Sequence, residues 1–224
     1  MRLDRRRFSR RAGVRCSQGV RHDLEEGALV LADISGFTEF VTATELEHGP
    51  PLIALLLEAV IGQISPPLEI QEVEGDAVFA IGADRILDGS RRGLLDALER
   101  AFAAFRRRRQ ELAADDSCGC AACRCVGSLD LKIVVHHGRF LRHEVGGRSQ
   151  VAGADVILTH RLLKNDVAGR AYLLLTEPAL RWADVDPEQA GLYIHIERYE
   201  HLGDVRCFVK ELGALEVIGV ARAA

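Results

Sequence analysis

The chain has 224 residues, of which 48% are hydrophobic and 28% are charged, and its formal net charge is −4 at pH 7. This composition is typical of one globular domain with a sizeable core, and the small negative charge gives no support for binding to nucleic acid. No apolar run approaches the ~18 residues that cross a bilayer, so we expect no membrane partner, and six cysteines that form no spread-out disulfide framework favour a reducing cytoplasm.

Residues 1–24 are rich in arginine and lack a periodic apolar pattern, so we interpret them as a basic flexible tail. The run Arg5-Arg6-Arg7-Phe8 resembles a twin-arginine export signal, but arginine and polar residues interrupt the segment where an apolar region should follow. The folded domain is therefore expected over residues 25–224, with a cysteine-rich loop at 115–127.

Hydrophobic periodicity, together with proline and glycine, predicts the elements after the tail. In chain order they are a strand over 27–33, helices over 37–47 and 52–64, strands over 68–73 and 77–81, a helix over 93–113, a strand over 129–136, a turn or hairpin over 138–147, a helix over 151–164, a strand over 171–176, a helix over 178–183, and strands over 193–199 and 205–211. This order contains too many hairpins for a doubly wound parallel sheet. It predicts an α+β fold in which a mostly antiparallel sheet carries helices on one face.

Two aspartates stand where apolar strands meet turns. Asp33 ends the first strand, just before residues that can open a helix, and Asp76 follows Gly75 in the turn of the expected hairpin. Paired carboxylates are hard oxygen ligands suited to Mg²⁺ or Mn²⁺ that carries a polyphosphate. The structural alternative is that Asp33 caps the helix and that Asp76 is a turn residue.

Four segments around these aspartates resemble, in the right order, the motifs of class III nucleotidyl cyclases, and the similarity is closest to a branch of uncharacterised cyclase-like proteins with a cysteine cluster. The segments are 32–38, 74–78, 131–138 and 153–162. The resemblance implies a ferredoxin-like βαββαβ core with an extra hairpin.

The resemblance also implies roles for individual residues. Metal ions would be held by Asp33, Asp76 and the backbone carbonyl of Ile34, and phosphate would be bound at Ser35, Gly36, Phe37 and Thr38. In the family the site forms between two chains. We therefore expect a homodimer in which the aspartates of one chain face Arg161 of the other, where this arginine contacts phosphate in the transition state.

Several family positions carry other residues here. Ile70 stands in place of a base-recognising lysine, Gln150 in place of an aspartate or cysteine, and Ile157 in place of the asparagine one turn before the arginine. For a late phosphate-binding lysine, Lys210 is the nearby candidate. Isoleucine cannot hydrogen-bond a base, whereas glutamine can donate and accept. Losing such groups costs several orders of magnitude in rate, so we expect a domain that binds a divalent metal and a nucleotide-like ligand while cyclase activity is weak or lost.

The cysteines Cys118, Cys120, Cys123 and Cys125 follow a C-x-C-x₂-C-x-C spacing. Thiolates select Zn²⁺, Cu(I) or an iron–sulfur centre, and we expect Zn²⁺. One short loop that supplied all four ligands would be strained, so we expect the site to be completed by His136, by His137 or by a second chain. A local disulfide or free thiols are the alternative.

Two other functions therefore remain open beside the metal- and nucleotide-binding domain. One is an active nucleotidyl cyclase that converts ATP or GTP to a cyclic nucleotide and pyrophosphate. The other is a non-catalytic metal-sensing or regulatory module that uses the cysteine loop.

His160, next to the expected arginine, is interpreted as a packing residue.

Overall fold

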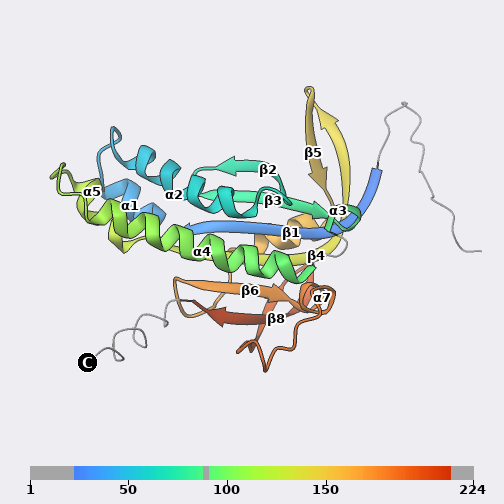
Figure 1. Cartoon of the computed structure of the whole chain (residues 1–224). Coiled ribbons are helices and arrows are strands. Elements are labelled where there is room, and N and C mark those ends of the chain that lie inside the picture. Colours follow the sequence, from blue (N-terminus) through green and yellow to red (C-terminus); the bar gives the residue numbers. More distant parts are fainter. Residues whose placement is uncertain (1–22, 88–90, 213–224) are drawn as a thin grey trace, which may run out of the picture.

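The computed structural model describes residues 23–87 and 91–212 (Figure 1). The basic tail expected over residues 1–24 therefore lies almost entirely outside the described residues. Among the residues that are described, no helix combines the length and the apolar character needed to cross a bilayer.

The described part of the chain contains one eight-stranded sheet. Its strands are β1 (Asp23–Ser35), β2 (Glu69–Glu74), β3 (Ala77–Ala83), β4 (Asp130–Val145), β5 (Arg148–Ala152), β6 (Tyr172–Thr176), β7 (Tyr193–Tyr199) and β8 (Gly203–Glu211). The strand order is β2-β3-β1-β4-β6-β8-β7, and β5 pairs with β4 as an added hairpin. Every pairing is antiparallel except that of β4 with β6, which confirms the mostly antiparallel α+β fold.

Helices connect these strands. They are α1 (Phe37–Ala43), α2 (Gly49–Ile64), α3 (Asp84–Leu87), α4 (Arg91–Ala113), α5 (Ala121–Cys125), α6 (Ala154–Arg161) and α7 (Glu177–Trp182), with a 3₁₀ turn, η1, at Val126–Ser128. Proline in the first turn of α2 lacks the N–H that would have no partner there, and Pro66 stops the helix two residues after its end. Together with β2, β3, β1 and β4, the helices α2 and α4 form the expected βαββαβ core.

The alternating residues of β1 show which helices cover which face of the sheet. Val30 and Ala32 belong to the larger core cluster, to which α2 and α4 contribute. Leu29 and Leu31 point to the opposite face, where Val156 of α6 packs against them. The two long helices therefore share one face, as expected, and α6 is an exception on the other. By the same alternation, Asp33 belongs to the face of α6.

The region around β5 differs from the sequence-based expectation. The chain forms a long hairpin, with Gly146 and Gly147 at its turn with φ of 59° and 75°, and β5 occupies 148–152. The helix expected over 151–164 begins only at Ala154, because Gly153 has a φ of 153°, which a helix does not allow. It ends at Arg161. Figure 1 shows this hairpin extending away from the rest of the sheet.

Candidate functional site

The two predicted carboxylates lie together at one end of neighbouring strands. β1 and β3 pair in a register that sets Asp33 opposite Ala77, and the Ile34 amide donates a hydrogen bond to the carbonyl oxygen of Asp76 at 3.1 Å. Gly75 forms the turn with a φ of 59°. The pKa of Asp76 rises to about 6, first because burial disfavours its charged form and then because Asp33 is a negative neighbour. The fold therefore places the two carboxylates close enough for their charges to interact.

Lys132, which the sequence analysis did not single out, faces this pair. It lies opposite Asp33 in the register of β1 with β4, and its Nζ is 3.0 Å from Asp33 Oδ2 and 3.2 Å from the carbonyl oxygen of Leu163. Burial raises the pKa of Asp33, and the ammonium group of Lys132 opposes that rise. On the next strand Tyr172 lies opposite Lys132. Aspartate, lysine and tyrosine thus form a polar row across three strands, which only the strand register could have predicted.

The turn over 35–38, expected to bind phosphate, connects β1 to α1. Ser35 is the last residue of β1, and Gly36 precedes the helix with a φ of 88°. A β-carbon at Gly36 would collide with the guanidinium group of Arg170, which also forms an ion pair with Glu39 at 3.8 Å. Arg170 therefore places a second cation beside the turn, and the sequence analysis missed it.

Two connected cavities lie beside Asp76. One has a volume of about 330 Å³ and is lined by Asp76, and the other has a volume of about 490 Å³ and is lined by Gln150. They share three lining residues, Glu72, Phe79 and His160. The ring of His160 packs against that of Phe79 with centroids 4.8 Å apart, yet His160 remains exposed. The position expected to contact a base is therefore continuous with the carboxylate site.

A buried histidine anchors α6 to the sheet. His136 hydrogen-bonds to Thr176 Oγ1 at 2.8 Å and to Asp155 Oδ1 at 3.2 Å, and Asp155 lies in the first turn of α6. The pKa of His136 is lowered mainly by burial. The neighbouring His137 contacts Asp84 at 3.1 Å on the other face. Both histidines are thus engaged within the fold and do not complete a site at the cysteine loop.

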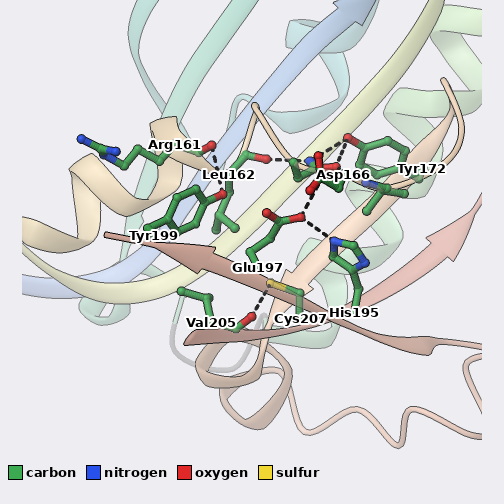
Figure 2. A network of polar contacts seen from close by, with 11 residues as sticks. Arg161, Leu162, Asp166, Tyr172, His195, Glu197, Tyr199, Val205 and Cys207 are labelled. Atoms are coloured by element: carbon green, nitrogen blue, oxygen red, sulfur yellow. Dashed lines mark hydrogen bonds and ion pairs between the residues drawn. The ribbon is translucent and has the colours of Figure 1, made fainter. Parts of the chain in front are cut away.

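The end of α6 is held by a polar network centred on Glu197, a residue only 6% exposed (Figure 2). The Asp166 amide donates to Glu197 Oε1 at 2.9 Å, and the Tyr199 hydroxyl donates to the carbonyl oxygen of Arg161 at 3.1 Å. Figure 2 shows the guanidinium group of Arg161 pointing away from this network. Ile157, one turn earlier, is 55% exposed. The backbone of α6 is therefore fixed, whereas both side chains at the expected transition-state positions face outward.

Two other expected positions lie on the helical face of the sheet. Ile70 packs against the larger core cluster, which explains an apolar residue there. Lys210 donates to Glu99 Oε1 of α4 at 2.6 Å. Within this chain, neither residue lies on the same face as Asp33.

The cysteine loop forms a separate group. Ligand atoms of Cys118, Cys120, Cys123 and His48 all lie within 4.8 Å of one another, and Cys125 is exposed and outside the group. The pKa of the Cys120 thiol falls to about 6, first because the Cys123 amide donates to its sulfur. The structure thus replaces the expected fourth cysteine with a histidine from the loop between α1 and α2.

Solved cyclase domains share this fold. The guanylyl cyclase Cya2 superposes with a TM-score of 0.66 and 16% identity, over 87% of this chain and 96% of that chain. The adenylyl cyclase CyaB from P. aeruginosa gives a TM-score of 0.64 and 16% identity, over 84% and 95% of the two chains. At this level of identity the similarity shows the fold, which is that of a class III nucleotidyl cyclase domain.

Sequence relatives place the chain more narrowly. The "Uncharacterized protein Rv2561/Rv2562" of Mycobacterium tuberculosis (strain ATCC 25618 / H37Rv) is 33% identical over 134 residues. That match spans 59% of this chain and 60% of the relative, so it leaves two fifths of the relative's length unmatched. A family described as "Protein of unknown function (DUF2652)" matches residues 53–172, which include Asp76, Lys132 and Arg161. The chain belongs to this DUF2652 family and has a nucleotidyl cyclase-like fold.

Proposed function

We propose that this domain binds one divalent metal ion, Mg²⁺ or Mn²⁺, together with a phosphorylated, nucleotide-like ligand. The observation that carries the proposal is the joint placement of Asp33 and Asp76: the pKa of Asp76 is raised first by burial and then by the negative charge of Asp33. Two carboxylates that repel each other in a half-buried site are destabilising by themselves, and a divalent cation relieves that repulsion.

The donor set fits a hard cation, because both candidate side chains are carboxylates. Lys132 adds one positive charge to the pair, since its Nζ is 3.0 Å from Asp33 Oδ2. Glu72 and Glu74 line the same cavity as Asp76, so the site keeps a net negative charge that favours a divalent cation. When bound, such an ion would polarise phosphate oxygens.

The surroundings suit an anionic ligand with a polar ring system. Arg170 lies against the turn at Gly36 and provides a cation for phosphate. The adjoining cavity of about 490 Å³ is lined by Gln150, Gln71 and Ser149, which together offer donors and acceptors to a base. Two of the structural neighbours are cyclase domains described in complex with ATPαS and with GTP, which supports a nucleotide as the ligand class.

The expected loss of cyclase activity is part of the proposal. Ile70 is packed into the core and offers no hydrogen bond to a base, and Ile157 offers none to a ribose. The exposed Arg161 is well placed to reach a second chain, so we propose a homodimer in which α6 of each chain approaches the aspartates of the other. Under this proposal the dimer binds its ligand and turns it over slowly or not at all.

The test measures binding of ATP and GTP by titration calorimetry with and without Mn²⁺, while cyclic nucleotide and pyrophosphate are followed in the same samples. We expect Mn²⁺-dependent binding that Asp33→Ala abolishes and that Glu144→Ala, an exposed carboxylate in the β4–β5 hairpin, leaves intact. Binding that is unaffected by Asp33→Ala would refute the site. Rapid turnover that Asp33→Ala removes would instead identify an active cyclase.

A further inference from the structure

We propose that His48, Cys118, Cys120 and Cys123 form a structural Zn²⁺ site that clamps the loop between α1 and α2 to the segment before β4. These four residues come from two parts of the chain that lie about 70 positions apart in sequence, as the contacts of His48 with Cys118 and Cys120 show. This site is separate from the aspartate pair and does not depend on the function proposed for it.

The distances between ligand atoms are close to those of a tetrahedral metal site. His48 Nδ1 is 3.0 Å from Cys120 Sγ and 3.4 Å from Cys118 Sγ, and all four ligand atoms lie within 4.8 Å of one another. A zinc ion bound at ~2.3 Å to sulfur and ~2.0 Å to nitrogen sets its ligand atoms about 3.5–3.8 Å apart. Small side-chain movements therefore suffice to place all four atoms around one ion.

The backbone of the loop is already arranged around Cys120. Its sulfur accepts a hydrogen bond from the Cys123 amide at 3.4 Å, which caps α5 and sets the two cysteines in a C-x₂-C turn. Ala122, between them, is fully buried in the larger core cluster. The turn is held by the buried Ala122 as well as by the hydrogen bond to the Cys120 sulfur. The two cysteines therefore stay close together.

A second set of contacts connects the two segments. The carboxylate of Glu45 accepts hydrogen bonds from the Ala121 amide at 3.1 Å and the Ala122 amide at 3.2 Å. Glu45 and His48 belong to the same loop, which follows α1. Figure 1 shows α1 and α5 side by side at one end of the molecule. His48 is therefore held next to the thiols by a protein contact that does not involve them.

The chemistry of the ligands selects the ion. Three thiolates and one imidazole form the Cys₃His set of closed structural zinc sites, which leave no position for a substrate. Hard ions such as Mg²⁺ prefer oxygen ligands, so the cluster does not compete for the ion of the aspartate site. Cys125 is exposed and lies outside the group, although its spacing in sequence is as regular as that of the other three.

The test uses the full-length protein, purified under reducing conditions, incubated with one equivalent of Zn²⁺ and desalted before elemental analysis. We expect one zinc per chain in the wild type and in Cys125→Ser. Zinc should be lost from His48→Ala and from Cys118→Ser. The matched pair of cysteine variants separates the proposed ligand set from the four-cysteine set.

Zinc that survives His48→Ala but is lost from Cys125→Ser would overturn the proposal, as would a wild type that retains no zinc or whose cysteines form a disulfide by mass spectrometry. Replacement of zinc by Co²⁺ in the wild type provides a readout that needs no variant to fold. We expect the intense visible absorption of a tetrahedral site, with sulfur-to-metal charge transfer from three thiolates. Absorption typical of octahedral Co²⁺ would refute the site.

Discussion

Replacing Asp76 by asparagine should stabilise the protein while it abolishes metal binding. Asparagine keeps the shape of the side chain and removes its charge. The raised pKa of Asp76 means that its charged form is disfavoured in the folded state, because of burial and of the nearby Asp33. If Asp76 served only to form the turn, it would stabilise the fold, and replacing it would lower the free energy of unfolding.

The size of the expected stability gain follows from the pKa of Asp76. A rise from the ordinary value of 3.8 to about 6 corresponds to about 3 kcal/mol of destabilisation at neutral pH. Asp76 is only about half-buried, so solvent screening reduces this figure, and we expect a gain of about 1 kcal/mol from Asp76→Asn. For a chain of this size that gain corresponds to about 2–4 °C in Tm.

The pH dependence of stability independently gives the sign of the change that Asp76→Asn causes. Between pH 3.8 and about 6 the folded state binds more protons at Asp76 than the unfolded state does, so wild-type stability falls as pH rises through this window. The difference between Asp76→Asn and wild type should therefore be largest above pH 6 and vanish below pH 3.8.

Urea unfolding across this pH range measures the effect, with and without Mn²⁺. Mn²⁺ should raise the free energy of unfolding of the wild type and leave that of Asp76→Asn unchanged. Glu144→Gln, an exposed carboxylate far along the β4–β5 hairpin, is the control and should behave as wild type in both respects. A variant that is less stable than wild type at pH 7 would refute the reasoning and return Asp76 to the role of a turn residue.

Three further predictions concern neighbouring residues. Lys132→Met leaves Asp33 without its cation, so urea unfolding at pH 7 should show a loss of about 2 kcal/mol, part of which Mn²⁺ restores; no loss would contradict the ion pair. Gly36→Ala should cost about 1 kcal/mol in the same assay, because alanine is strained at the φ of 88° while the exposed Arg170 side chain can move aside, and a neutral result would argue against this turn geometry. The pKa of His136 is lowered from its ordinary value of 6.5, so the folded state binds this proton less readily than the unfolded state does. The free energy of unfolding should therefore decrease as the pH falls below 6.5. His136→Gln should remove this part of the pH dependence.

The order of elements could be predicted from the sequence because most of them have a strong local pattern. The strand before Asp33 is continuously apolar, and prolines mark both ends of α2. The pattern failed over 148–152, where mostly polar residues form β5 only because they pair with β4. The late start of α6 depends on the backbone of Gly153, and glycine is compatible with many conformations, so its presence alone did not predict the boundary.

The candidate site also contains residues that a local motif predicts and residues that it does not. Asp33 and Asp76 could be identified because each lies in a contiguous motif. Lys132 and Arg170 could not, because their importance comes from side chains that are distant in sequence. Lys132 reaches Asp33 through the pairing of β1 with β4, and Arg170 reaches Gly36 from the segment before β6. Both add positive charge where the sequence analysis counted only carboxylates and a turn.

The cysteine loop shows why the remaining residue of the proposed zinc site could not be predicted. Strain in a short loop predicted that a residue from elsewhere would join the thiols, and His48 lies beside them, but the strain did not indicate which residue it would be. His136 and His137 follow the loop closely in sequence, yet the pairing of β4 with β1 and β6 directs them to Asp155 and Asp84. His48 reaches the cysteines because Glu45 ties its loop to α5. A ligand set divided between two segments therefore depends on the packing of helices, which no local pattern in either segment specifies.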